Sequence, residues 1–297
     1  MTFDRAARRK VFSHGMTVLT GLAIVVIMVP LVALIYQVVL LGAPVMNVAF
    51  FTQQNPQPCD HSLPGLTCHQ GGVVVPIEGT LELIGLSALF SVPVGVGAAI
   101  FAVEYGGERR SARIIGMVAD VLSGVPSIIA GVFTFTLFVI YDPTIAFSTL
   151  DASLALTVLM VPIVTRTCEE ALRTVPNSVR EAALALGISR WKMSLRITFV
   201  AALPGVITGI LLSIARSAGE AAPLLIAGGY ACAHPLQSIT TQTCALPLFI
   251  YIGANSGVHN YVVLAWGCAL LLLMLILVMS VLSRFTLNRM ARRMRGE

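Results

Sequence analysis

The chain has 297 residues, of which 57% are hydrophobic and only 11% are charged, and its net charge is +5 at neutral pH. Its mean hydropathy of +0.88 lies far outside the usual range of soluble domains, so lipid is expected to be its main solvent. The positive balance does not indicate nucleic-acid binding, because the arginines border apolar segments and no basic face is interleaved with base-stacking aromatics.

Six apolar windows are long enough to cross a bilayer, which takes about 20 mostly apolar residues. They run from Thr17 to Leu41, Thr80 to Val103, Ile114 to Tyr141, Leu150 to Cys168, Pro204 to Ala227 and Tyr261 to Leu282. We therefore expect an all-α membrane protein with six transmembrane helices. A cytoplasmic segment at 1–16, one transmembrane domain at 17–283 and a basic tail at 284–297 account for the whole chain.

The distribution of Lys and Arg predicts the orientation, since short cytoplasmic loops accumulate these residues. Basic residues precede the first window, occupy the second connection from Arg109 to Arg113, and run through the fourth connection from Arg166 to Arg196. The loops 42–79, 141–153 and 228–260 contain none. We expect a multi-pass protein of the plasma (inner) membrane with both termini in the cytoplasm, and we expect Arg216 alone among the basic residues to lie inside a span.

Four cysteines fall in the predicted outer loops as two local pairs, Cys59 with Cys68 and Cys232 with Cys244. An oxidising exterior allows two disulfides there, although four cysteines permit three pairings and the sequence does not choose among them. The first pair and two nearby histidines could also be read as metal ligands. Their spacing fits no standard zinc pattern, so we expect no metal site.

The third window contains a helix breaker, the run Gly124-Val125-Pro126-Ser127. In lipid, the backbone groups freed by such a break are satisfied by neighbouring helices, hydroxyls or water, which indicates a packed bundle or a pathway. Ser127 adds a hydroxyl where freed amides favour anions, although it equally repairs the break made by Pro126. Asp120, just before the break, is expected near a membrane face in a solvated role.

The fourth connection, about 173–200, predicts a helix, a turn and a second helix. Ser178 and Glu181 have the S-x-x-E spacing of a capping box, and Gly187 suits the end of the first helix. The short apolar-faced helix between them either lies on the membrane surface or fits into a groove of a partner protein.

This connection resembles the cytoplasmic loop of the permease subunits of bacterial ABC importers. The matching positions of the E-A-A…G motif and its later apolar position are Glu181, Ala182, Ala183, Gly187 and Ile197. Phe199 and Val200 stand where the family has Leu-Pro. The resemblance implies a type I ABC importer permease fold and a loop that docks into a cleft of a separate ATP-hydrolysing subunit.

Three further stretches resemble the phosphate-specific permeases of that family, and in particular the shorter, A-type subunit. They are Ser123 to Gly131, Ala215 to Leu225 and Ala245 to Tyr251. The resemblance implies a second homologous permease, two ATPase subunits that carry ATP and Mg, an external phosphate-binding protein and surrounding membrane lipid as partners. It implies no cofactor on this chain.

Arg216 and Glu220 are the predicted substrate-pathway residues. If the fifth span enters at Pro204, a rise of about 1.5 Å per residue places Arg216 roughly 18 Å into the membrane. An unpaired charge there is costly, so it should face protein or water, and Glu220 should share its helical face four residues on. Guanidinium suits phosphate oxygens, whereas the alternative is an ion pair that only satisfies itself.

The chain is not expected to be an enzyme. A phosphate-binding P-loop needs Gly-Lys-Ser or Gly-Lys-Thr, and the only lysines, Lys10 and Lys192, follow Arg9 and Trp191. The predicted function is therefore the membrane subunit of an ATP-driven phosphate importer. The alternatives are a permease for another oxyanion (phosphonate, sulfate or molybdate), a secondary anion transporter or channel, and a membrane scaffold or sensor.

Overall fold

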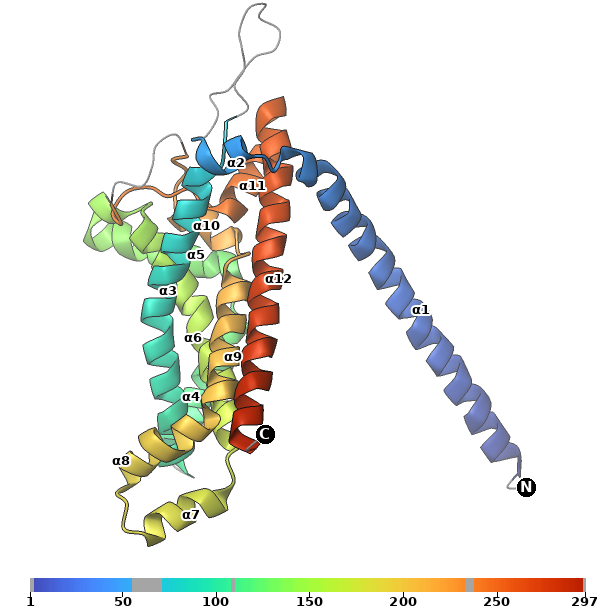
Figure 1. The fold of residues 1–297 in the computed structure, drawn as a ribbon, viewed down its shortest axis with the longest axis vertical. Coiled ribbons are helices and arrows are strands. Elements are labelled where there is room, and N and C mark those ends of the chain that lie inside the picture. The colour runs from blue at the N-terminus through green and yellow to red at the C-terminus, as the bar shows by residue number, and fades with distance from the viewer. Residues whose placement is uncertain (1–2, 55–70, 108–109, 233–237, 296–297) are drawn as a thin grey trace, which may run out of the picture.

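The computed structural model describes residues 3–54, 71–107, 110–232 and 238–295 (Figure 1). Within these ranges the regular secondary structure is entirely helical, which confirms the predicted all-α class. Five helices are long and apolar enough to cross a membrane, and a bent pair brings the number to six if it counts as one crossing.

The five long helices follow one another along the chain in the order of the predicted spans. They are α1 (Phe3–Gly42), α3 (Val74–Ile100), α6 (Thr149–Arg173), α9 (Phe199–Ser217) and α12 (His259–Arg295). The bent pair comprises α4 (Arg110–Ser123) and α5 (Ser127–Tyr141). Short helices connect them, namely α2 (Val48–Thr52), α7 (Asn177–Ala185), α8 (Arg190–Met193), α10 (Ala222–Ala227) and α11 (Leu246–Asn255), with 3-10 turns η1 (Ala43–Val45) and η3 (Pro143–Ile145). Two π-helical turns, η2 (Phe101–Gly106) and η4 (Ser194–Thr198), extend α3 and join α8 to α9.

The third span is broken where the sequence predicts it. α4 ends at Ser123, α5 begins at Ser127, and the two helices are bent by 103°. Pro126 precedes the first residue of α5 in an extended conformation, and the restriction that proline places on its neighbour stops α4 before it. The window from Ile114 to Tyr141 is therefore two helices, with α5 turned crosswise to α4.

The chain ends share one end of the bundle. In Figure 1 the N-terminal end of α1 and the C-terminal end of α12 both point toward the end that carries α7 and α8. α2 lies near the opposite end, next to the predicted outer loops. This arrangement agrees with an even number of crossings and with the predicted separation of arginine-rich connections from arginine-free loops.

α3, α6 and α9 form the centre of the bundle, and glycines let them approach closely. A Cβ atom at Gly95 of α3 would lie 2.8 Å from the Cβ of Val164 on α6. A Cβ at Gly205 of α9 would lie 2.8 Å from the Cβ of Ala171, and one at Gly209 would lie 2.7 Å from that of Thr167. The G-x-x-x-G pair in α9 is thus used for packing against α6, as such spacing usually is in membranes.

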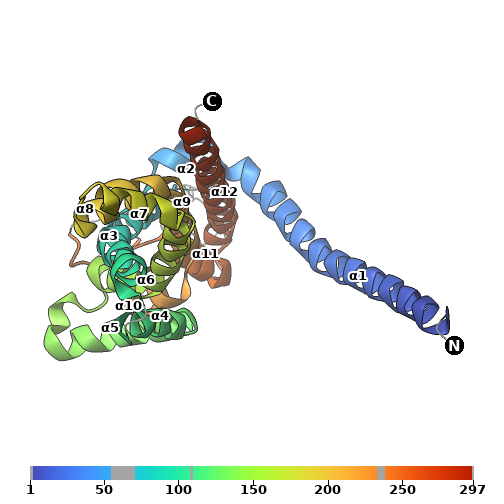
Figure 2. The same cartoon turned by 90° about the horizontal axis from the view of Figure 1, so that it is seen from below.

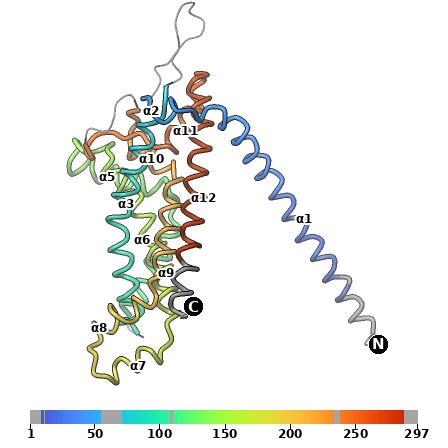
Figure 3. The backbone as a smooth tube through the Cα atoms, in the orientation of Figure 1, coloured from blue at the N-terminus to red at the C-terminus, as the bar shows by residue number. Residues whose placement is uncertain are grey.

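α1 stands apart from the rest of the bundle, which Figures 2 and 3 show from below and as a backbone tube. The most apolar window of this helix has none of its residues buried. It contacts α12 near its end at Gly42, where a Cβ would lie 2.9 Å from the Cβ of Leu270. The apolar surface of α1 is suited to lipid or to another membrane subunit.

Alanine substitutions at two glycines of α3 test this packing. We expect Gly95→Ala to lower the thermal midpoint of the purified protein in detergent by several degrees, because overpacking against Val164 costs about 1–3 kcal/mol. Gly97→Ala, two residues away with no neighbour within 4 Å, is the matched control. It should leave the midpoint unchanged or raised, since alanine favours helix over glycine. Equal losses at both positions would contradict the close approach of α3 to α6.

Candidate functional site

Two of the sequence motifs meet inside the bundle. α5 packs against α10, and a Cβ at Gly131 of α5 would lie 2.8 Å from the Cα and 2.7 Å from the carbonyl oxygen of Pro223 in α10. Only a residue without a side chain allows this approach. The stretch that ends at Gly131 and the stretch that contains Pro223 are therefore in direct contact, although 92 residues separate them in the chain (223 − 131).

Ser127 is the first residue of α5 and lies one turn before Gly131. It is half-buried, and no side-chain hydrogen bond caps the helix there. Its hydroxyl makes no hydrogen bond to any described residue that would repair the break after Pro126. The start of α5 thus offers unused amides and a hydroxyl near the contact with α10, which is the arrangement that favours anions.

Arg216 occupies the last turn of α9, which ends at Ser217. Its side chain is exposed on the surface of the chain, whereas Ala215, Ser217 and Ala218 around it are buried. The ion pairs found among the described residues involve other arginines, and none of them includes Arg216. The guanidinium of Arg216 therefore forms no ion pair with the described part of the chain, and its N–H groups are available to another partner.

Glu220 does not share a helical face with Arg216, so this part of the prediction is wrong. α9 ends three residues before Glu220, whose backbone N–H donates to the carbonyl of Ser217 at 3.2 Å in the turn toward α10. Gly219 and Pro223, two residues that disfavour helix, follow the end of α9. Glu220 is half-buried and makes no ion pair with Arg216.

Arg166 lies on α6, which continues to Arg173, and the fourth predicted window, Leu150 to Cys168, already contained it although the sequence analysis counted it with the fourth connection. What the sequence analysis missed is its pairing. The acidic residue three positions later, Glu169, was the available signal, because residues i and i+3 adjoin on a helix. The expectation that Arg216 alone among the basic residues lies within a span stays a prediction, since α6 is identified as a crossing helix by its length and composition.

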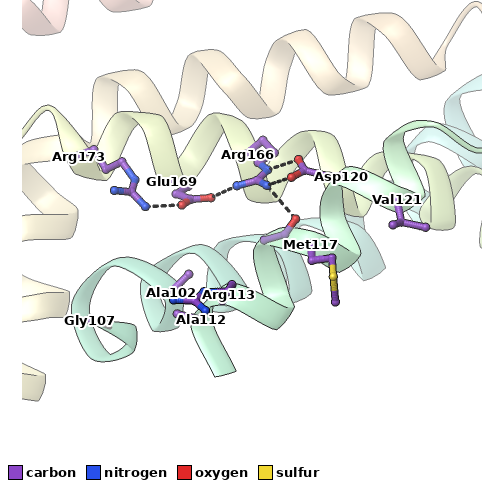
Figure 4. A pocket seen from close by; sticks show the side chains of 11 residues that line it. Ala102, Gly107, Ala112, Arg113, Met117, Asp120, Val121, Arg166, Glu169 and Arg173 are labelled. Carbon is purple, nitrogen blue, oxygen red and sulfur yellow. Dashed lines mark hydrogen bonds and ion pairs between the residues drawn. The ribbon is translucent and has the colours of Figure 1, made fainter. Parts of the chain in front are cut away.

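The guanidinium of Arg166 is fully engaged by the protein (Figure 4). Its Nε donates to Asp120 Oδ1 at 2.9 Å and its Nη2 lies 2.5 Å from Asp120 Oδ2. Nη2 also donates to the Gly116 carbonyl at 2.8 Å, and Nη1 donates to Glu169 Oε2 at 2.8 Å. Asp120 is thus paired with Arg166 across two helices, a contact that the sequence analysis did not expect, while its side chain stays 67% exposed, in keeping with the solvated position expected for it.

This network lines a cavity of about 470 Å³ between η2, α4 and α6. Arg173 extends the network, since its Nη2 donates to Glu169 Oε1 at 2.7 Å. Figure 4 shows Glu169 between the two arginines, with Asp120 on the far side of Arg166. The two cations and two carboxylates of the network balance, so the network joins α4 to α6 as a neutral link, while Arg113 adds a further positive charge to the lining of the cavity.

The predicted docking helix is α7. Glu181 and Ala182 of the motif are exposed, Ala183 is buried, and Gly187 follows the helix with a φ of +76°, which favours glycine. The predicted capping box is wrong. α7 begins at Asn177 after Pro176, with no side-chain cap, so Ser178 already lies inside the first turn.

Leu184 and Leu186, at the end of α7, are 46% and 81% exposed. Leu186, one turn after Ala182, adds a large apolar side chain beside the exposed Glu181 and Ala182, and this outward face is suited to a protein groove, whereas Leu184 lines the pocket on the side of Arg180. The structure thereby supports a docking role more than a helix lying idle in solvent.

A disulfide joins Cys232 to Cys244 in the loop between α10 and α11. The other predicted pair, Cys59 and Cys68, lies outside the described residues. Cys168 and Cys268 are free and buried. Among the described residues no group of three or more His, Cys, Asp or Glu side chains is placed to hold a metal ion.

Comparisons with known proteins agree with this architecture. The model of the family described as binding-protein-dependent transport system inner membrane component matches residues 91–296. Phosphate transport system permease protein PstA 1 of Mycobacterium tuberculosis is 39% identical over 274 residues, which cover 91% of this chain and 86% of that protein. PstA of Haemophilus influenzae is 33% identical over 278 residues, covering 93% and 94%.

Solved structures show the same fold. A chain of the MetNI methionine ABC transporter in an inward-facing conformation superposes with a TM-score of 0.59 at 18% sequence identity, covering 73% of this chain and 95% of that one. At this identity the likeness concerns the fold alone, which is that of a type I ABC importer permease.

Substitution of Arg166 tests the network between α4 and α6. We expect Arg166→Gln to lower the stability of the purified protein by about 1.5–3 kcal/mol, because it removes charge-assisted hydrogen bonds and leaves the nearly buried Glu169 with one partner. Arg173→Gln is the control, since that arginine is 66% exposed and has a single partner. Its loss should be less than 1 kcal/mol, near that of other surface pairs, at about 0.2–1 kcal/mol. Equal losses in thermal or denaturant unfolding would contradict the assigned role of Arg166.

Proposed function

The chain belongs to the binding-protein-dependent transport inner membrane components, and from this membership we propose that it is the membrane subunit of an ATP-driven importer for inorganic phosphate. It forms half of the translocation pathway and couples to a separate ATPase. The observation that carries the cargo assignment within the chain is the free guanidinium of Arg216 at the break between α9 and α10. The relatives named as phosphate permeases support it independently.

The contrast between the two membrane arginines supports Arg216 as the anion-binding group. Most N–H groups of Arg166 already donate to Asp120, Glu169 and a backbone carbonyl, so few remain to bind a substrate. Arg216 makes no such bond to the described residues. A planar guanidinium that stays charged at all relevant pH values presents paired donors to phosphate oxygens.

The exposure of Arg216 supports a second permease subunit. Arg216 lies twelve residues after Pro204, so if the span enters the membrane at Pro204, a rise of about 1.5 Å per residue places Arg216 roughly 18 Å into it. An unpaired charge there costs several kcal/mol against lipid, by the order of magnitude of insertion measurements. Its surface must therefore face a water-lined path, and a homologous permease placed against α9 would enclose that path. Glu220 and Ser127 are proposed to border it.

We propose that a pair of ATPase subunits, which bind ATP and Mg, drives transport and contacts α7 and the turn after it through Glu181, Ala182, Ala183 and Gly187. An extracytoplasmic binding protein delivers phosphate at the opposite face. The chain itself is proposed to be non-enzymatic, with its termini in the cytoplasm and its helices in the plasma (inner) membrane. A self-sufficient secondary carrier would have no use for the exposed docking helix.

Other oxyanions are the second candidate cargo class, because a guanidinium recognises the tetrahedral oxygens of sulfate, molybdate and phosphonate in a similar way. The names of the relatives favour phosphate over these. Competition of each anion against labelled phosphate would rank them directly.

Uptake measurements test the role of Arg216. In vesicles containing the full complex and the binding protein, we expect Arg216→Gln to lower ATP-dependent phosphate uptake at least tenfold, which corresponds to the loss of about 1.4 kcal/mol or more of anion stabilisation. Arg216→Lys keeps the charge but loses the planar pair of donors, so its phosphate uptake should lie between that of the wild type and that of Arg216→Gln. The control is Arg110→Gln, an exposed arginine at the start of α4. Uptake that survives in Arg216→Gln at normal complex levels would refute the assignment.

A further inference from the structure

An almost fully buried ion pair connects the docking helix to the base of the bundle. Glu104 of η2 is 3% exposed, and its Oε1 lies 3.0 Å from both Nε and Nη2 of Arg180 on α7. The side chains of Arg180 and Glu104 are only 15% and 2% exposed. Burying such an ion pair costs free energy unless its remaining donors and acceptors form hydrogen bonds. The other contacts of Arg180 therefore decide whether the pair holds α7 stably against the bundle, as a joint between them.

The remaining N–H donors of Arg180 form hydrogen bonds with backbone carbonyls at the end of α6 and just after it. Its Nη2 donates to the Leu172 carbonyl at 2.9 Å and its Nη1 donates to the Val175 carbonyl at 2.6 Å. Leu172 lies in the last turn of α6, where carbonyls have no partner within the helix. One guanidinium therefore ties α7 both to the extension of α3 and to the end of α6.

Arg190, the first residue of α8, holds the same turn from the other side of the connection. Its Nη2 donates to the Glu104 backbone carbonyl at 2.5 Å, and its guanidinium carbon lies 5.5 Å from the centre of the Tyr105 ring. The segment that contains α7 is thus attached to η2 before and after Gly187. η2 is itself π-helical, a geometry that leaves backbone carbonyls open to such donors and often marks functional sites.

The two faces of α7 have different partners. Arg180 points inward to Glu104 and Leu184, one turn later, lines the same pocket, whereas Glu181 and Ala182 are exposed and available to the ATPase. Besides the Arg180 contacts, α7 is connected through short turns at 174–176 and at 186–189 and packs through the buried Ala183 near α8 and η4, but no other described ion pair ties it to α3 or α6. Without the Arg180 contacts it could tilt under load without moving the membrane helices.

We propose that Arg180 and Glu104 are the positioning residues that make α7, α3 and α6 move as one body, so that displacement of the docking helix by the ATPase reaches the membrane helices. This inference rests on the proposed function for the presence of an ATPase. It assigns to the two residues a role in transmission and not in binding of either the ATPase or the cargo.

The test is a double-mutant cycle in the reconstituted complex, with phosphate moved per ATP hydrolysed as the readout. Glu104→Gln and Arg180→Gln should each assemble with the ATPase and lower this ratio at least tenfold. The double variant should be no worse than either single variant, because both remove the same joint. Arg196→Gln, an exposed arginine of η4 in the same connection, is the control and should keep the wild-type ratio.

A wild-type ratio in both single variants would overturn the proposal, and so would losses that multiply in the double variant. A loss of transport that merely follows the amount of assembled complex would also overturn it, since that is what a purely structural role predicts. If Arg180→Gln cannot be purified, Arg180→Lys keeps the charge and loses the fork to Leu172 and Val175. Its ratio should fall at least threefold, and an unchanged ratio would count against the joint.

A second readout does not depend on the cargo. Addition of ATP to the complex should change amide hydrogen exchange at residues 101–106 in the wild type and leave it unchanged in Glu104→Gln. Failure of the wild type to move phosphate would refute the proposed cargo alone. Equal exchange changes in the wild type and Glu104→Gln would refute the joint alone.

Discussion

The structure depends on one electrostatic constraint, namely that a charge within the membrane must have a protein partner or face water. Arg166 meets it with two carboxylates and a carbonyl, and the result is a neutral link between α4 and α6. Arg216 does not meet it within the described chain, so its partner has to come from outside. The same residue type thus has different consequences, since Arg166 links two helices of the chain, whereas for Arg216 we propose a further subunit and a hydrated path.

The same constraint applies to the backbone, because lipid satisfies no freed N–H or C=O group. The chain interrupts helices at 124–126 and again at 218–221, and α5 and α10, the helices that follow these breaks, are packed together through Gly131 and Pro223. The elements that follow the two breaks thus contact each other, while Gly124, Pro126 and Gly219 at the breaks are exposed on the surface of the chain. Arg216 immediately precedes the second break, so a guanidinium without an ion-pair partner among the described residues lies next to irregular backbone.

Much of this arrangement could be predicted from the sequence, because hydropathy, proline and glycine act locally. The spans, the helix break at 124–126 and the end of the docking helix at Gly187 follow from such signals. The end of α9 at Ser217 did not, and the expected continuation of that helix put Glu220 on the face of Arg216. The pair of Glu104 and Arg180 joins residues 76 positions apart, and no local pattern specifies a contact of that kind.

The close packing of α6 on α9 gives the docking helix a mechanical connection to the anion site. Arg180 holds the end of α6, and on the same helix Ala171 and Thr167 contact Gly205 and Gly209 of α9. Because no space for a Cβ atom is left at these two glycines, α6 and α9 are closely packed, and a displacement of one helix is expected to carry the other with it. Because Arg216 lies in the last turn of α9, a displacement of α7 that moves α6 would then also move the guanidinium. Access to the proposed anion site and the position of the proposed docking helix would thus be linked through a single packed unit.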